Sequence, residues 1–422
     1  MKNLKVRLAL MNFLEFAVWG AYLTCMGRYL GNIGVSTEIG YFYSMQGVVS
    51  IFMPAIIGII ADRWIPAQRM LGICHLVAST FMMLTAWYGA TAEGGVDFAT
   101  IFSLYSISVG FYMPTLALSN SVAYTVLRNA GMDTVKAFPP IRVFGTVGFI
   151  LTMWFVDIMG FQTNHWQFVT SAVIGIVLFV YSFTLPNCPV AKDDKHRSLS
   201  EAFGFQAFSL FRNRQLALFF IFSMLLGVSL QITNGYANPY ISSFAAQDVY
   251  ADTFGVQHAN ILISLSQISE TLCILLIPFC MKRFGIKNVM LIAMFAWVLR
   301  FALFGIGNPG DGVWMFILSM IVYGVAFDFF NVSGSLFVDE NTSPEIRSSA
   351  QGVFMLMTNG IGGTVGVILA QHIINAYTHG VTIGDNFYTV GEWSTCWYIF
   401  AAYALVVGVV FALVFHPKKI RQ

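Results

Sequence analysis

The sequence predicts an all-α membrane protein, and three observations support that prediction. Of its 422 residues, 57% are apolar and only 10% are charged, and the mean hydropathy is +0.72. Soluble domains carry about 25% charged residues. Apolar runs of about 20 residues, long enough to cross a bilayer as a helix, recur along the whole chain. Water is therefore not the main solvent of this protein.

Comparing these runs with the length of a bilayer-spanning helix predicts twelve transmembrane helices. The first run continues through Trp19 and Tyr22 without a small-residue cleavage site, so we interpret it as a retained helix and not as a signal peptide. The predicted spans begin near Leu8, Gly40, Leu71, Phe98, Pro140, Trp166, Leu216, His258, Asn288, Val313, Ala350 and Trp393.

Charge alternates between the polar gaps that separate the spans. One set of gaps is basic, and the other holds acidic residues with no Lys or Arg. Because Lys and Arg accumulate in cytoplasmic loops, the basic gaps and both termini are predicted to face the cytoplasm. The basic gaps hold Arg63 with Arg69, Arg128 with Lys136, the cations from Lys192 to Arg214, those from Lys282 to Lys287, and Arg347.

The longest polar gap divides the spans six and six, which predicts an N-terminal bundle (residues 1–186), a cytoplasmic linker (187–215) and a C-terminal bundle (216–422). Residues 58–63 read Gly-Ile-Ile-Ala-Asp-Arg, and a basic loop, 282–287, stands in the corresponding place of the second half. Here the chain resembles the major facilitator superfamily, although an ordinary helix end flanked by cations is the alternative for the motif alone. The resemblance implies a substrate site between two six-helix halves.

Polar side chains at bilayer depth are candidate functional residues, because a charged group there costs about 3 kcal/mol on an insertion scale. Arg142 lies in segment 138–149, whose two prolines open the helix. Spacings of four and seven residues place Arg142, Thr146 and Phe149 on one face. A guanidinium, a hydroxyl and an aromatic edge suit a polyhydroxylated ligand. The alternative is that Arg142 reaches the cytoplasmic surface.

Two pairs of polar residues occur in the seventh and eighth spans. Gln231 and Asn234 are three residues apart, and their carboxamides can recognise a nucleobase edge or a sugar hydroxyl, or can simply join helices. Gln267 and Glu270 are likewise one turn apart. Glu270 is the first candidate for binding the coupling proton. A permanent ion pair with Arg300 is the competing structural interpretation.

The tenth span places Tyr323 and Phe327 on one face, where their rings could stack on a flat base or only pack within the protein. Asp328 points about 100° away from Phe327. Asp328 is either a second proton site or the partner of Arg300, and the sequence leaves both open. Glu15 in the first span is a third proton-coupling candidate, ranked below Glu270.

These same residues lie in blocks that look like the bacterial nucleoside:proton symporter family within the major facilitator superfamily. The resemblance covers essentially the whole chain, and its five blocks occur in the expected order at residues 129–133, 138–146, 225–234, 266–271 and 323–330.

The resemblance implies proton-coupled nucleoside uptake by alternating access. It assigns roles that the residue patterns alone do not give. In chain order these are ribose contacts for Arg142 and Thr146, a pocket wall for Phe149, base recognition for Gln231 and Asn234, the polar side of the pocket for Gln267 and Glu270, and aromatic walls for Tyr323 and Phe327.

Other classes of function are disfavoured by the sequence. No nucleophile–base set or His-Glu-x-x-His motif indicates an enzyme, and neither the linker nor the tail is large enough for a signalling domain. The six cysteines and the histidines lack metal-ligand spacing, so no metal or cofactor is predicted. A net charge of +2 gives no nucleic-acid surface. We expect a monomer in the bacterial inner membrane that takes nucleosides and protons, with a sugar or polyol:proton symporter as the alternative.

Overall fold

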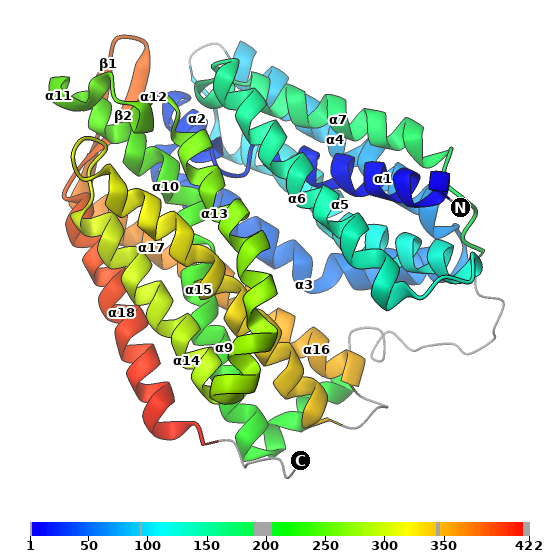
Figure 1. Cartoon of the computed structure of the whole chain (residues 1–422). Coiled ribbons are helices and arrows are strands. Elements are labelled where there is room, and N and C mark those ends of the chain that lie inside the picture. Colours follow the sequence, from blue (N-terminus) through cyan, green and yellow to red (C-terminus); the bar gives the residue numbers. More distant parts are fainter. Residues whose placement is uncertain (1, 93–94, 190–204, 343–346, 417–422) are drawn as a thin grey trace. The chain divides into compact units, whose positions relative to one another are not determined.

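The computed structural model describes residues 2–92, 95–189, 205–342 and 347–416. The chain folds into two compact units, Met1–Arg197 and Ser198–Gln422. Both units are built from helices, and the only sheet within the described ranges is a two-stranded hairpin in the second unit (Figure 1). The division falls inside the predicted linker 187–215, while the proposed limits of the two bundles stay predictions.

In the first unit, α1 packs against α6 and α7, α3 packs against α5, and α4 packs against α5 and α7. The short helix α2 and the 3₁₀ turns η1 and η2 connect these longer helices. The bounds are α1 Lys2–Gly20, α2 Met26–Asn32, η1 Ser36–Glu38, α3 Ile39–Arg63, α4 Ala67–Thr91, α5 Phe98–Asn129, α6 Thr134–Ile158, η2 Phe161–Thr163 and α7 Trp166–Ser182.

The second unit repeats this packing order. There α9 packs against η6 and α17, α13 packs against α15, and α14 packs against α15 and α18. The bounds are η3 Phe205–Arg212, α9 Arg214–Leu230, α10 Ile232–Ser243, η4 Phe244–Ala246, α11 Asp248–Ala251, α12 Phe254–Gln257, α13 Ala259–Cys273, η5 Ile274–Leu276, α14 Ile277–Ile306, α15 Val313–Glu340, α16 Arg347–Met355, η6 Leu356–Gly362, α17 Gly363–Tyr377, β1 Thr378–Ile383, β2 Asn386–Gly391 and α18 Trp393–Val414.

The predicted spans fall on these helices. Among the described residues, nine helices are long and apolar enough to cross a membrane, and one of them, Ala259–Ile306, contains two predicted spans. The backbone is kinked within it at Gly285, whose φ of +76° lies in the region that glycine adopts most readily. The residues of the predicted basic gap, 282–287, therefore form a short kinked connection between two helices. The multi-pass helical prediction is confirmed, and the count of twelve membrane crossings stays a prediction.

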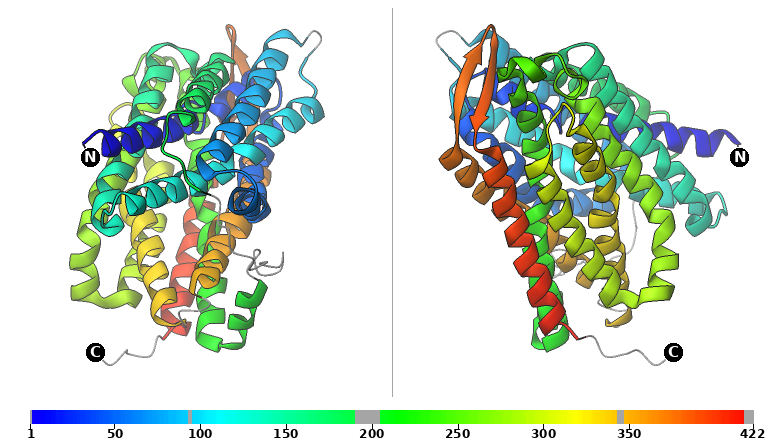
Figure 2. Two further views of the ribbon diagram at one scale, coloured as in Figure 1. Left: turned by 90° about the vertical axis from the view of Figure 1, so that its right-hand side faces the viewer. Right: turned by 60° about the vertical axis from the view of Figure 1, so that its left-hand side comes forward.

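A β-hairpin was not predicted from the sequence. Strand β1 pairs antiparallel with β2 from Thr378 opposite Gly391 to Ile383 opposite Asn386. The two-residue turn begins at Gly384, with φ +59°. The hairpin connects α17 with α18 (Figure 2, orange), where the sequence indicated only a polar gap.

Glycines allow two helix pairs to approach backbone to backbone. A Cβ atom at Gly148 of α6 would overlap the carbonyl oxygen of Phe13 in α1, and one at Gly20 of α1 would overlap that of Phe149. In the second unit, Gly366 of α17 faces the carbonyl oxygen of Val228 in α9 in the same way. Small residues commonly make such close contacts between membrane helices. Corresponding helix pairs in the two units therefore approach each other closely in the same way, through glycine residues.

We predict that Gly366→Ala lowers thermal stability in detergent, because the added methyl group has no space and overpacking costs about 1–3 kcal/mol. Gly352→Ala is the matched control, since nothing lies within 4 Å of a Cβ at this exposed helical position. The control should be neutral or slightly stabilising, because alanine favours helix by about 0.5–1 kcal/mol. Equal melting temperatures for the two variants would contradict the close approach of α17 to α9.

Candidate functional site

The predicted site residues of the first unit lie on α6 and face α1. The Arg142 guanidinium lies over the ring of Phe16, 3.9 Å from its centroid. Phe149 is buried and packs edge-on against Trp19, with 6.2 Å between ring centroids. Thr146 lies between them along the helix and is half-buried, as Arg142 is. The shared face predicted from spacing is therefore the face that contacts α1.

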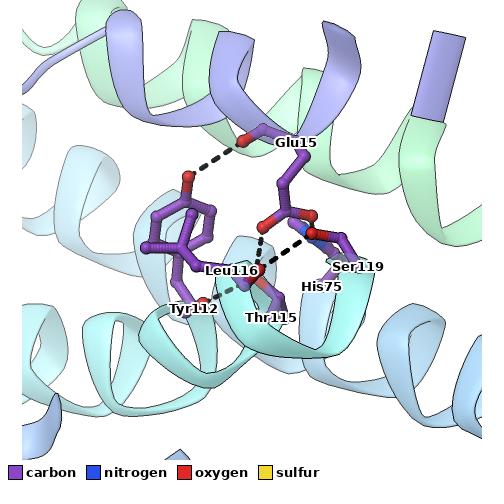
Figure 3. A network of polar contacts seen from close by, with 6 residues as sticks. All are labelled: Glu15, His75, Tyr112, Thr115, Leu116 and Ser119. Atoms are coloured by element: carbon purple, nitrogen blue, oxygen red, sulfur yellow. Dashed lines mark hydrogen bonds and ion pairs between the residues drawn. The ribbon is translucent and has the colours of Figure 1, made fainter. Parts of the chain in front are cut away.

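On another side of α1, Glu15 forms a fully buried polar network (Figure 3). Its Oε2 lies 2.7 Å from Nε2 of His75 on α4, and its Oε1 accepts a hydrogen bond from the Thr115 hydroxyl of α5 at 2.5 Å. The Tyr112 hydroxyl donates to the Glu15 backbone oxygen at 2.8 Å. Sequence reasoning missed the pair of Glu15 with His75. Only the presence of an acid and a histidine in different apolar spans could have suggested it.

In the second unit, Gln231 interrupts the seventh predicted span between α9 and α10. Asn234 Nδ2 donates to Gln231 Oε1 at 3.0 Å, so the two carboxamides are aligned with each other. The side chain of Gln231 lies next to Gly363 at the start of α17. Both amides are half-buried. The hydrogen bond that joins them is local and does not connect separate spans.

Gln267 and Glu270 are half-buried on α13 and lie beside α15. The two helices are held by a hydrogen bond from the Ser269 hydroxyl to the Ile321 carbonyl and by contact of Gly324 with Ser269. Gln267 Oε1 is buried and has no hydrogen-bond partner. A buried amide oxygen without a partner is costly, so this atom is available to a ligand donor.

Tyr323 and Phe327 stack on α15, with ring centroids 5.5 Å apart and an interplanar angle of 14°. Tyr323 and Asp328 both lie within electrostatic reach of Glu270. Asp328 is buried, and its Oδ2 has no hydrogen-bond partner. The structure therefore gathers Glu270, Tyr323 and Asp328 where α13 meets α15.

Arg300 does not form the ion pair that the sequence left open. Within the described part of the chain its guanidinium is close to no carboxylate; Nη1 instead donates to the Ser319 carbonyl at 2.7 Å. The cation lies over two rings, 4.6 Å from the centroid of Tyr323 and 5.4 Å from that of Phe304. Ring faces attract cations electrostatically, and this replaces an acidic partner. The pairing of Arg300 with Glu270 or Asp328 is therefore wrong.

No cluster of three or more His, Cys, Asp or Glu side chains that could hold a metal occurs among the residues the structure describes. The nine predicted substrate contacts, six polar and three aromatic, lie in two groups. One lies on α6 against α1 in the first unit, and the other is distributed over α9, α10, α13 and α15 in the second.

Long apolar helices in two similarly packed units, with polar groups inside them, are typical of membrane transporters with a major-facilitator-like fold. The fold is shared with the xylose transporter XylE from E. coli, which has 13% identity and a TM-score of 0.63 and is covered completely, as is this chain. At that identity the likeness concerns the fold alone.

The family is more specific. Residues 1–420 match the model of the family described as "Nucleoside H+ symporter", and the chain belongs to that family. The nucleoside permease NupG of Escherichia coli strain K12 is 46% identical (99% of this chain, 97% of NupG). The xanthosine permease of the same organism is 43% identical (100% and 99%).

A crystal structure of a mutant of the nucleoside transporter NupG superposes with a TM-score of 0.90 at 44% identity, covering 98% of this chain and all of that one. The family and the transporter function predicted from the sequence are confirmed, and the relatives are permeases rather than enzymes. The roles assigned to individual site residues stay predictions.

We predict that Arg300→Lys destabilises the protein. Lysine keeps the charge but loses the flat contact with two rings and the planar hydrogen-bond geometry. A loss of about 2 kcal/mol is expected from one charged hydrogen bond and the weakened cation–π contacts. Thermal unfolding in detergent measures this. Arg283→Lys, at an exposed arginine 5.9 Å from one ring centroid, is the control; identical melting temperatures for the two variants would refute the role of Arg300.

Proposed function

We propose that this protein takes up nucleosides together with protons across the bacterial inner membrane by alternating access. In this proposal twelve membrane crossings form two six-helix bundles, both termini are cytoplasmic, and the monomer is the working unit in the lipid bilayer. The full-length match to the nucleoside H+ symporter family and the names of the relatives support the substrates. The alternating basic gaps support the orientation.

One observation carries the assignment of the substrate site. All six predicted polar contacts lie in predicted membrane spans and are half-buried, whereas Glu15, His75, Arg300 and Asp328 are buried. A side chain without accessible surface cannot contact a substrate directly, whereas a half-buried polar side chain can. The six are Arg142, Thr146, Gln231, Asn234, Gln267 and Glu270.

In the proposed site Arg142 and Thr146 contact the ribose, and Phe149 lines the pocket. The aligned carboxamides of Gln231 and Asn234 recognise the base edge, since together they offer donors and acceptors. The chemistry of each group and membership of the family support these proposed roles.

For the second unit we propose that the Oε1 of Gln267, which has no hydrogen-bond partner, accepts from a ligand donor, and that Glu270 adds a further polar contact. The stacked rings of Tyr323 and Phe327 form the aromatic walls, on which a base can stack.

For proton coupling we propose Glu270 first, Asp328 second and Glu15 third. Glu270 is half-buried, so a ligand and the proton can both reach it. Asp328 lies within electrostatic reach of Glu270. Two carboxyl groups that interact in a medium of low dielectric constant favour holding a proton over both being ionised.

We predict that proteoliposomes with an inward proton gradient accumulate uridine or adenosine, and that Glu270→Gln abolishes gradient-driven accumulation. The amide keeps the shape of the side chain but cannot exchange a proton. Asp311→Asn makes the same chemical change at an exposed loop carboxylate and should transport normally. Wild-type uptake that does not depend on the proton gradient would refute symport. If uptake by Glu270→Gln keeps the wild-type pH dependence, Glu270 does not have this role.

A sugar or polyol substrate is the alternative, because the hydroxyl-binding residues do not require a base. We predict that uridine competes with labelled uridine far better than ribose does. Asn234→Leu should raise the KM for uridine about tenfold, the effect of one lost hydrogen bond of about 1.4 kcal/mol. Asn288→Leu, at an exposed asparagine of α14, is the control. Equal inhibition by uridine and ribose would favour the polyol alternative.

A further inference from the structure

The buried pair of Glu15 and His75 is not used by the substrate contacts described above. Both side chains have no exposed surface, and Oε2 and Nε2 are 2.7 Å apart (Figure 3). The partners come from α1 and α4, sixty residues apart in the chain. Buried ionisable groups inside a membrane protein are rare and commonly have a function.

The other titratable and charged groups around this pair can be named for each neighbouring helix. On α4, Cys74 precedes His75 and interacts electrostatically with Glu15. Tyr112 of α5 packs edge-on against the imidazole at 5.9 Å between centroids and interacts with both Glu15 and Arg142 of α6. On α7, a Cβ atom at Gly175 would lie 3.7 Å from Nδ1 of the imidazole, and glycine has no ionisable group. Arg142 is the only permanent cation in this group.

The hydrogen bonds around the pair can accommodate one additional proton. His75 Nδ1 is buried without a hydrogen-bond partner, which favours the tautomer that carries its proton on Nε2 and donates it to Oε2. The Thr115 oxygen lies 2.5 Å both from Glu15 Oε1 and from the Tyr112 carbonyl oxygen. With Glu15 ionised, the hydroxyl donates to Oε1.

With a proton on Oε1, the carboxylic acid donates to the Thr115 oxygen and the hydroxyl turns to the Tyr112 carbonyl. Both states satisfy the same atoms and differ by one proton. The pair carries one negative charge in the first state and none in the second.

The pair is joined to the proposed substrate site through α1. The residue after Glu15 is Phe16, and the Arg142 guanidinium lies over the Phe16 ring. One turn further, Trp19 packs against both Tyr112 and Phe149. Because α1 is a continuous helix tightly packed on α6, a change of charge at Glu15 acts directly beside Arg142 and Phe149. Tyr112 interacts electrostatically with both Glu15 and Arg142, so loss of the negative charge at Glu15 changes the electrostatic environment around this shared neighbour of the Arg142 guanidinium.

We propose that Glu15 and His75 form a proton-binding positioning pair that makes nucleoside affinity depend on pH through Arg142 and Phe149. This inference rests on the proposed function. The pair accepts one proton at Oε1 when nucleoside binds and releases it when nucleoside leaves. It is a site additional to Glu270 and contacts no substrate itself.

The experiment measures uridine binding to the purified full-length protein by isothermal titration calorimetry over a pH series, in buffers of different ionisation enthalpy. The wild-type Kd should rise with pH, by up to about tenfold per pH unit for one linked proton. Glu15→Gln and His75→Gln should each make the Kd depend less steeply on pH. Each should also reduce the number of protons that the protein takes up when uridine binds. If the two groups act as a pair, the double variant should match the single variants, because effects within one unit do not add.

Two further variants keep the inference testable if a buried substitution prevents folding. Thr115→Val retains both titratable groups but removes the hydroxyl that changes its acceptor, so it should move the midpoint of the Kd profile. Asp133→Asn, at an exposed carboxylate near Lys136, is the control and should leave the midpoint unchanged. A purely structural role would lower thermal stability in the variants but leave the pH profile in place.

The outcomes separate this inference from the proposed function. If wild-type protein neither binds nor transports uridine or adenosine, the proposed function fails. If the wild type transports and Glu270→Gln loses coupling, but Glu15→Gln, His75→Gln and Thr115→Val retain the wild-type pH profile, only the positioning pair is overturned.

Discussion

Inside a bilayer every polar group must find its partner within the protein, because no water is present to supply one. The backbone meets this requirement by forming helices in both units. Many hydroxyls meet it by donating to a carbonyl four residues earlier, as Thr85 does to Phe81 at 2.7 Å and Ser223 to Phe219 at 2.8 Å. The few side chains that need more than this local solution are therefore the informative ones.

The two units satisfy their buried charges differently. In the first, Glu15 is surrounded by an imidazole, a hydroxyl and a phenol from two neighbouring helices. In the second, Arg300 has aromatic faces and a carbonyl oxygen instead of an acid. This leaves Asp328 without a cationic partner in the described part of the chain. The two units therefore accommodate charge at bilayer depth with different kinds of partner.

Periodicity and composition predicted the helices because a bilayer-spanning helix needs only a long apolar run. They also predicted which candidate site residues share a face, as for Arg142 and Phe149 on α6, because this follows from 3.6 residues per turn. The pair of Glu15 with His75 could not be predicted, since nothing local relates residues sixty positions apart. The aromatic rings that contact Arg300 could not be predicted either, because aromatic residues occur throughout the chain and any of them could have been the neighbour.

Irregular backbone occurs next to the residues proposed to recognise the base. The seventh predicted span is interrupted at Gln231, and the π-helical segment η6 packs against the helix that precedes this interruption. Gly363, the first residue after η6, lies against the Gln231 side chain. Broken helices carry substrate sites in several transporter folds, and π segments are frequent at functional sites. A regular helix would fix the direction of Gln231 and Asn234, whereas a break there lets the amides turn without moving the glycine contact between α9 and α17. The position of the break therefore links the packing of the second unit to the chemistry of its proposed site.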